Sequence, residues 1–543
     1  MMNKKNYISE LVTMNEYATW LSGKKVMLVA PTGLGKTRFV LSKFLPFCIS
    51  QRRKVAILCN RRLLREQYLY DLAEMYTRYY IMNEQVQLFT YQTLAEYIMK
   101  GQNLGKVLED FDVIVCDEAH FFYADADFNV YGTFVLLQVL IKICIHKCVL
   151  FISATADEVI PLLDRTLELC GKTYGISEEF CSLKVLDYTY LSDYSRFRCF
   201  FVEDVQSLCR RIGESPKKTI VFIDDKKKAE ELKRKLMDIS DIKEKAIFTL
   251  NADVLDECSN SKEVQQLVVD HRILPKVLIT TSVLDNGVSV HDTDVGNVVI
   301  ATDSKLSFIQ MLGRIRSESS AECNLYFYPR DEKYYERRIE QTNGKMQKIA
   351  TMEQSIKLRK SDLVIQLWDE IDTFYRNVAV LVKESEIYYS SDVMPVRILC
   401  GDFVLAVNEF AKEKIGNLAL AYRRFFKAAM HHQVEVAKAQ IAWIGKTPDD
   451  LIVLKSTYRE ERIQELKQRL LAIKNVSNEE LQEIKSKLAR DFREDLIGDI
   501  VTKNQSFSKG KFVEICECYD LKLIENKDLN GKKRYTVIEK EDI

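Results

Sequence analysis

The sequence predicts an α/β protein in which two consecutive parallel-sheet domains precede a mainly helical region. Between about residues 24 and 330, short aliphatic or β-branched runs alternate with loops containing Gly, Asp or Thr and with longer helical stretches. This alternation is typical of parallel sheets that are covered by helices. The segment 181–197 lacks helical periodicity and separates the first four of these runs from the last three. Beyond about residue 330, charged segments with apolar residues three and four apart indicate amphipathic helices.

Seven apolar runs are the strands that we expect in the two sheets. They are KVMLVA (25–30), KVAILCN (54–60), DVIVCDE (112–118), CVLFISA (148–154), TIVFIDD (219–225), KVLITT (276–281) and NVVIAT (297–302). Each is short and aliphatic, as buried parallel strands are. We therefore predict a first domain over 1–185, a second over 186–330 and a helical accessory region over 331–543. Asn530-Gly531 lies between two apolar runs and suggests a terminal hairpin.

The composition limits how the chain can bind nucleic acid, zinc or a membrane, and it indicates the compartment. The 79 basic and 79 acidic residues balance, so any nucleic-acid binding requires a local basic groove. Several of the 14 cysteines sit inside apolar runs, for example Cys59 and Cys116, which indicates free thiols in a reducing compartment and a cytoplasmic location. The spacing of the cysteines offers no four-ligand zinc set. The most apolar stretch, 134–145, is too short to span a bilayer and is interrupted by Gln138 and Lys142, so we expect no membrane contact.

A glycine-containing loop follows the first expected strand. APTGLGKT (30–37) precedes a helix-like segment and matches the phosphate-loop pattern G-x-x-x-x-G-K-[ST], except that Ala30 holds the first position. The alternative, a glycine turn without a ligand, does not account for Gly-Lys-Thr in this context. Lys36 would neutralise the β- and γ-phosphates of a nucleotide, and Thr37 would bind Mg²⁺. The expected nucleotide-binding residues of the loop are Pro31, Thr32, Gly33, Leu34, Gly35, Lys36 and Thr37.

An acidic pair follows the third expected strand. DEAH (117–120) comes directly after this strand, and ligands bind at the carboxyl ends of strands in such sheets. Asp117 can hold the Mg²⁺ shell, and Glu118 can orient and deprotonate an attacking water. Taken alone, an acidic pair at the end of a strand is often only a turn. Together with the phosphate loop it predicts an ATP- and Mg²⁺-dependent site.

Further segments resemble the motif series of superfamily 2 helicases and translocases over about residues 24–320. NRRLLREQ (60–67) is similar to motif Ia, FTYQTL (89–94) to Ib/Ic, SAT (153–155) to III, IVFIDD (220–225) to IV, TTSVLDNGVSV (280–290) to V and QMLGRIR (310–316) to VI. The resemblance implies two RecA-like domains with ATP in the cleft between them. It also implies nucleic-acid contacts at Arg61, Arg62, Thr90, Gln92 and Thr281, a nucleotide contact at Gly287, and coupling roles for His120, Ser153 and Thr155.

Motif VI departs from the widespread form QxxGRxxR. The resemblance implies that Gln310 and Arg314 face the nucleotide across the cleft. The position of the second arginine is held by Ser317, and Arg316 stands one residue earlier. We expect Arg316 to serve in its place. The expected catalytic set is therefore Lys36, Asp117, Glu118, Gln310, Arg314 and Arg316.

Two basic runs, 226–228 and 233–235, allow two interpretations. They could line a track for phosphates, or they could be the solvated face of a helix, and the second is favoured because charged helix faces are common.

The leading functional hypothesis is an ATP-dependent helicase or translocase, with DNA favoured over RNA because the motif forms look more like bacterial or mobile-element DNA-processing members. The alternative is an ATP-gated clamp or sensor that regulates a protein partner through residues 331–543. A third possibility, a degenerate structural fold, is disfavoured because Lys36, Asp117, Glu118 and Arg314 are intact.

Overall fold

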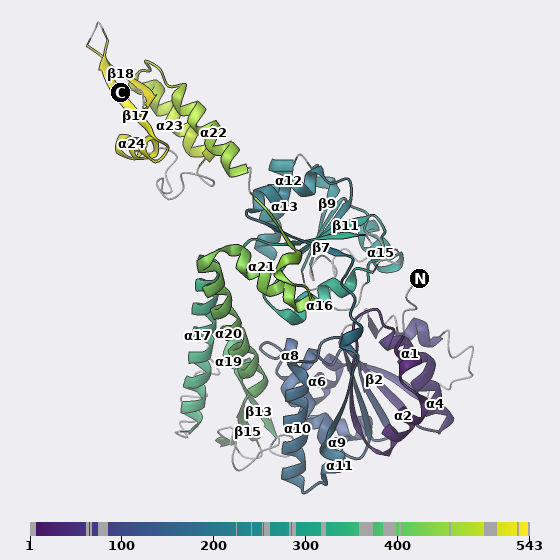
Figure 1. The fold of residues 1–543 in the computed structure, drawn as a ribbon. Helices are drawn as coiled ribbons and strands as arrows, with labels where there is room; N and C mark the ends of the chain where they lie inside the picture. The colour runs from purple at the N-terminus through teal and green to yellow at the C-terminus, as the bar shows by residue number, and fades with distance from the viewer. Residues whose placement is uncertain are drawn as a thin grey trace. The chain divides into compact units, whose positions relative to one another are not determined.

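The computed structural model of the chain (Figure 1) describes residues 7–60, 64–65, 68–73, 85–223, 225–240, 242–251, 254, 261–281, 284, 289–316, 322–357, 373–383, 398–400, 403–455, 458–492, 508–528 and 531–540. The chain forms two compact units. The first comprises residues 1–201 and 212–452, and the second comprises residues 202–211 and 453–543.

The first unit begins with a six-stranded parallel sheet in the order β3-β2-β4-β5-β1-β6. Its strands are β1 (Lys25–Val29), β2 (Val55–Cys59), β3 (Val86–Thr90), β4 (Val113–Cys116), β5 (Cys148–Ser153) and β6 (Leu183–Asp187). Its helices include α3 (Lys36–Phe39), α6 (Tyr91–Met99), α8 (Phe121–Ala124), α9 (Leu136–Ile143) and α10 (Val159–Tyr174). Apolar cores cover both faces of the sheet, because residues of β1, β4 and β5 contribute alternately to two separate clusters. These three strands are adjacent, so the segments that follow them meet at one edge.

A second, seven-stranded sheet has the order β16-β7-β12-β11-β8-β10-β9. Its strands are β7 (Phe197–Val202), β8 (Lys218–Ile223), β9 (Ile247–Leu250), β10 (Val277–Thr280), β11 (Val295–Ala301), β12 (Cys323–Phe327) and β16 (Leu451–Leu454). The pairings from β7 through β9 are parallel. Helix α13 (Lys226–Ser240) follows β8, and α16 (Lys305–Arg314) follows β11. Helix α16 begins where the Ser304 side chain accepts a hydrogen bond from the backbone of Ser307.

The predicted α/β class with two parallel sheets is confirmed, and all seven expected strands are present. The strands that the sequence did not reveal include β3 and β6, which form the two edges of the first sheet. Their residues are partly exposed, so neither shows the continuous apolar run of a central strand. The predicted boundary at residue 185 falls inside β6.

The rest of the first unit is mainly helical, as predicted. Helices α17 (Glu332–Lys357) and α20 (Glu409–His431) pack together, with α19 (Thr373–Val378) beside them and α21 (Gln433–Ile441) following α20. A small antiparallel sheet, which the sequence did not indicate, joins β13 (Ala379–Lys383), β15 (Phe403–Val407) and β14 (Ile398–Cys400). No helix among the described residues combines the length and the apolar character needed to cross a bilayer.

The second unit contains α22 (Tyr458–Leu471), α23 (Asn478–Phe492), α24 (Lys509–Cys518), β17 (Leu521–Lys527) and β18 (Lys533–Glu539). The two strands pair antiparallel on either side of the predicted Asn530-Gly531 turn, of which Asn530 lies outside the described residues. Leu466, Leu470, Phe492, Phe512 and Tyr535 belong to a buried cluster of this unit's own residues. The unit therefore has its own core.

Candidate functional site

The phosphate loop lies between β1 and α3, as its sequence predicted. Gly33 (φ +86°) and Gly35 (φ +75°) adopt the left-handed conformation that side chains other than glycine rarely accept. The backbone N–H of Ala30 donates to the carbonyl of Ser153 (3.1 Å), which ties the loop to the end of β5. The loop is thus held by the sheet at one end and continues into a helix at the other, which is the arrangement that cradles phosphate groups.

Lys36 folds back over the phosphate loop. Its Nζ donates to the carbonyl oxygens of Ala30 (2.7 Å) and Pro31 (3.2 Å). Burial lowers the pKa of Lys36 to about 8, and the negative charges of Glu118 and Asp117 act in the opposite direction. An anionic ligand at the loop would add to that opposing influence and stabilise the ammonium form.

Asp117 is buried at the end of β4 and is held through both of its carboxylate oxygens. Oδ1 accepts from the backbone N–H of Glu118 (2.9 Å), and Oδ2 accepts from the hydroxyl of Tyr68 (2.6 Å). Burial, together with the neighbouring charge of Glu118, raises the pKa of Asp117 to about 6. The side chain of Thr37 also lies beside the Tyr68 hydroxyl, where it acts to lower the Tyr68 pKa against the larger, opposite effect of burial. The two residues predicted to bind Mg²⁺, Thr37 and Asp117, therefore meet at one tyrosine hydroxyl.

Glu118 lies between a histidine of its own motif and an arginine of the second sheet. Its backbone is left-handed (φ +52°), and a non-glycine residue in that conformation is uncommon. Arg314 Nη2 donates to Glu118 Oε1 (3.3 Å), and His120 Nδ1 lies 3.3 Å from Oε2, in a geometry too poor for a well-aligned hydrogen bond. Burial acts to raise the pKa of Glu118, but the contact and charge of His120 and the charges of Arg314 and Lys36 outweigh it and hold the pKa well below its usual range. The carboxylate is therefore kept ionised.

A chain of polar contacts runs from the acidic pair to α16. His120 Nδ1 and Ser153 Oγ lie 3.2 Å apart, and Ser153 Oγ accepts from the backbone N–H of Thr155 (3.1 Å). Gln310 then donates to Thr155 Oγ1 (3.4 Å) and accepts from Arg314 (3.5 Å). The three residues predicted to couple, His120, Ser153 and Thr155, thus lie together with the predicted motif VI residues.

The carboxyl end of α16 lies directly against the phosphate loop. A Cβ atom added to Gly313 would stand 2.0 Å from Thr32 Oγ1 and 2.6 Å from Thr32 Cβ, so only glycine permits this approach. Arg316 Nη1 lies 3.9 Å from the position of a Cβ added to Gly33. Arg316 Nε is buried without a hydrogen-bond acceptor among the described residues, and burial lowers the pKa of the guanidinium. A buried donor without a partner beside a phosphate loop suits an anionic ligand. Ser317 lies outside the described residues.

The structure gives less information on the residues that were predicted to contact nucleic acid. Arg61 and Arg62 lie outside the described residues, and so does Gly287, the predicted nucleotide contact. Thr90 is buried and caps α6 by accepting from Thr93 N–H (3.1 Å), while Gln92 donates to Asn60 (3.1 Å). Thr281 is buried after β10, and its backbone N–H donates to Leu250 (3.2 Å). The side chains of Thr90 and Gln92 thus have local partners, and nucleic-acid roles for Thr90, Gln92 and Thr281 stay predictions.

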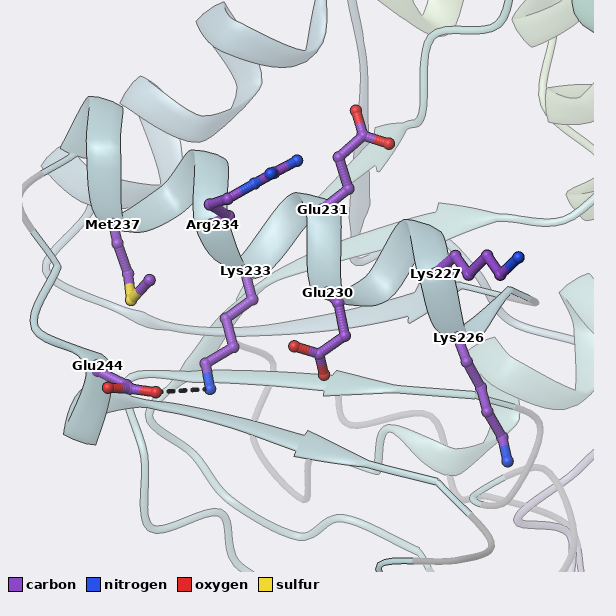
Figure 2. Close-up of a pocket in the computed structure, with 8 residues that line it drawn as sticks. All are labelled: Lys226, Lys227, Glu230, Glu231, Lys233, Arg234, Met237 and Glu244. Atoms are coloured by element: carbon purple, nitrogen blue, oxygen red, sulfur yellow. Dashed lines mark hydrogen bonds and ion pairs between the residues drawn. The ribbon is translucent and has the colours of Figure 1, made fainter.

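Both basic runs that could have lined a phosphate track lie on α13, where acidic side chains are interspersed (Figure 2). Lys233 pairs with Glu244 (3.0 Å), and Lys235 pairs with Glu231 (2.8 Å). Lys228 stacks over the Tyr334 ring, 4.1 Å from its centroid. Because these cations have partners in the protein, the geometry favours a solvated helix face.

Three contributors to the site were not among the predicted residues. Gly313 stands inside QMLGRIR, so its place in the motif could have marked it. Tyr68 directly follows the motif Ia segment but belongs to none of the motifs, so only the fold brings its hydroxyl to Asp117. Tyr91 is a similar case, because its hydroxyl donates to the carbonyl of Asp117 (2.9 Å) from a different helix.

One family model matches the part of the chain that contains the phosphate loop and the acidic pair. Residues 6–158 match the family model described as type III restriction enzyme, res subunit. No curated protein sequence matches the chain.

Solved structures show weak likenesses. S. cerevisiae Dbp5 bound to RNA and ADP BeF3 is 18% identical, with a TM-score of 0.41, over 60% of this chain and 84% of Dbp5. The DUF1998 helicase MrfA bound to DNA and AMPPNP is 14% identical, with a TM-score of 0.41, over 60% of this chain and 49% of MrfA. The E. coli DExH-box NTPase HrpB is 15% identical, with a TM-score of 0.38, over 60% of this chain and 42% of HrpB. These scores are too low to bear on function.

Proposed function

We propose that this protein is an ATP-dependent nucleic-acid helicase or translocase of superfamily 2. Its motifs, its two parallel sheets and its match to the res-subunit family model support this proposal. The proposal depends mainly on one contact. Arg314, on α16 beside the second sheet, pairs with Glu118, which follows β4 of the first sheet. A hydrolysis site that needs side chains from two domains couples turnover to their association.

Each charged residue around the contact between Glu118 and Arg314 has a role in hydrolysis that follows from its position. Glu118, held ionised, orients the attacking water and accepts its proton. Arg314 and Arg316 supply positive charge where negative charge develops on the transferred phosphoryl group, and Lys36 neutralises the adjacent phosphates. In related phosphoryl-transfer enzymes such an arginine contributes roughly 10³–10⁵ in rate.

The residues present also suit Mg²⁺. Thr37 offers a hydroxyl and Asp117 a carboxylate, and both contact the same Tyr68 hydroxyl, so their oxygens lie close together. Mg²⁺ prefers oxygen ligands of this kind. When bound, the ion neutralises charge on the nucleotide phosphates.

We favour DNA as the track because the forms APTGLGKT and QMLGRIR look more like those of DNA-processing members. This preference rests on analogy of motif form, since motors of this kind contact mainly the phosphate backbone. We place the protein in the cytoplasm, because buried free thiols such as Cys48 and Cys116 suit a reducing compartment.

Steady-state ATPase activity of the purified protein tests the proposal. The rate is measured alone and with single-stranded DNA, duplex DNA and single-stranded RNA, with Glu118→Gln as the blank. Strong stimulation by a nucleic acid is expected, and the polymer that stimulates most identifies the track. Hydrolysis that is indifferent to all three polymers would contradict a nucleic-acid motor.

A second candidate, an ATP-gated clamp that regulates a protein partner, is favoured by the contacts of α20. Asn417 donates to the Tyr123 hydroxyl (3.1 Å), and Asn408 donates to the carbonyl of Ala126 (2.9 Å), so α20 holds the segment that follows Asp117 and Glu118. A partner bound to residues 331–543 could act on the site through this contact. Both candidates predict ATPase activity, but only a motor unwinds a duplex or moves along a strand, so strand-displacement and translocation assays separate them.

A further inference from the structure

The second unit has an arrangement of elements that its sequence did not indicate. Helix α22 is followed by a single bridge in which Val476 and Tyr535 exchange backbone hydrogen bonds (3.0 and 2.9 Å), and then by α23, α24 and the β17–β18 hairpin. The unit therefore runs as one helix, one bridge, two helices and a hairpin. Fold alone does not assign function, but the charges on the surface of the hairpin indicate what this unit can bind.

The hairpin is the basic part of this unit. Residues 521–540 carry six basic and three acidic side chains, a net charge of +3. Residues 458–492, which include α22 and α23, carry eight basic and seven acidic side chains, a net charge of +1. The whole chain is neutral, so this positive charge is local. A local basic surface is what binding to phosphates requires of a neutral protein.

The register of the hairpin places like charges opposite each other. Lys527 of β17 faces Lys533 of β18 across the ladder, and like charges directly opposite destabilise a hairpin. Glu525 partly offsets this repulsion, because it pairs with Lys533 (2.7 Å) and with Lys509 of α24. The Glu525 carboxylate thus forms ion pairs with two ammonium groups. An added anion would relieve the remaining repulsion.

Several of the hairpin lysines stand free in solvent. Lys522, Lys527 and Lys532 are exposed and form no ion pair with any described residue. Lys509 lies over the Tyr535 ring, 4.8 Å from its centroid, which joins the first turn of α24 to the same surface. Figure 1 shows the strands running outward past the helices of the unit. Lys527 and Lys533 lie on the same side of the ladder as Tyr535, whereas Lys522 lies on the opposite side, so these lysines surround the hairpin. We refer to Lys509, Lys522, Lys527, Lys532 and Lys533 together as the hairpin surface.

We propose that the hairpin surface is a second nucleic-acid contact, which binds the phosphate backbone without reading sequence. Lysine ammonium groups act as point charges toward phosphate, and the hairpin surface consists of lysines alone. The proposal rests on the proposed function in one respect, since a nucleic-acid motor supplies the polymer. A second contact on the same chain raises overall affinity by keeping the strand near the motor when the motor releases it.

The test compares two full-length triple variants with the wild type. Lys522→Gln/Lys527→Gln/Lys532→Gln removes three charges from the hairpin surface. Lys455→Gln/Lys467→Gln/Lys487→Gln is the matched control, because it removes three lysine charges from the same unit outside the hairpin surface. Fluorescence anisotropy gives the Kd of labelled single-stranded DNA, RNA and duplex DNA, without nucleotide, between about 50 and 200 mM salt.

The hairpin variant is expected to bind at least about tenfold more weakly than the control, with the slope of log K against log salt shallower by about 2 to 3. Lys527→Gln alone keeps the test valid if the triple variant unfolds, and it should lower the slope by about 0.7 to 0.9. Equal Kd values and slopes for the hairpin and control variants would overturn the proposal and leave an acidic protein as the class of partner to examine.

The ATPase assay separates this proposal from the proposed function. Without nucleic acid, the hairpin variant should hydrolyse ATP at the wild-type rate, because none of its three lysines lies in the first unit. If no polymer stimulates the ATPase activity of the wild type, the proposed motor function is contradicted. The Kd values from anisotropy would still test nucleic-acid binding by the hairpin surface.

Discussion

Replacing Gly313 by alanine adds one methyl group at the point where α16 meets the phosphate loop. The new Cβ would stand 2.6 Å from Thr32 Cβ, whereas ordinary contacts of this kind lie at 3.4–4 Å. The Thr32 hydroxyl, at 2.0 Å, can rotate away, but Thr32 Cβ is fixed to the backbone of the loop. The helix and the loop must therefore separate by roughly 1 Å, and a displacement of that size costs about 10²-fold in a positioned reaction.

We expect the ATPase kcat of Gly313→Ala to fall about 100-fold, which corresponds to about 2.7 kcal/mol in the activation free energy. Nucleotide affinity should change much less, because the phosphate loop and the acidic pair belong to the first sheet alone. The assay is steady-state turnover of the full chain, together with equilibrium binding of a fluorescent ATP analogue and a thermal unfolding curve.

Gly344→Ala on α17 is the matched control for this prediction, since an added Cβ there meets nothing within 4 Å. It should leave kcat unchanged and slightly stabilise the helix. Wild-type kcat in Gly313→Ala, with the protein folded, would show that α16 does not approach the phosphate loop during turnover. The same reasoning predicts partial rescue of Gly313→Ala by Thr32→Gly, which removes the opposing side chain.

Three further substitutions test individual side chains of the site. Lys36→Ala should abolish turnover while the melting temperature stays near that of the wild type; a wild-type ATPase rate would remove Lys36 from the site. Arg316→Ala should slow hydrolysis far more than Ser317→Ala, because Arg316 lies beside Gly33; equal and small effects would exclude both from catalysis. Tyr68→Phe deletes the hydroxyl that holds Asp117 (2.6 Å), and loss of such an outer partner costs about 10–100-fold in metal affinity or activity. A Mg²⁺ titration of its ATPase should therefore shift to higher Mg²⁺ concentration, and a curve identical to that of the wild type would refute the role given to Tyr68.

The central strands of both sheets could be predicted because each is a continuous aliphatic run, buried on both faces. Edge strands such as β6 could not, because Lys184 and Val185 are exposed and leave no apolar run to recognise. The small β13–β15–β14 sheet was missed for a related reason. Its strands lie among helical segments, and a short apolar run there does not distinguish strand from helix.

The residues of the proposed ATP site could be predicted because motif chemistry depends on spacing within short segments. Gly33, Gly35 and Lys36 share one loop, and Asp117 and Glu118 are consecutive, so the sequence itself sets their relation. The partners of these residues come from distant segments. The Tyr68 hydroxyl on Asp117 and the approach of Gly313 to Thr32 join residues 49 and 281 positions apart. No local pattern encodes such pairs.

The sequence by itself determined the fold class, the predicted nucleotide site and the order of the motifs, because hydrophobic periodicity and loop composition are local properties of a chain. Only the tertiary structure decided which charges meet. It placed Arg314 on Glu118, left Arg316 Nε buried beside the phosphate loop, and set Lys527 opposite Lys533 on the hairpin of the second unit. Electrostatic energies depend on distance and burial, and these are fixed only when segments far apart in the chain pack together.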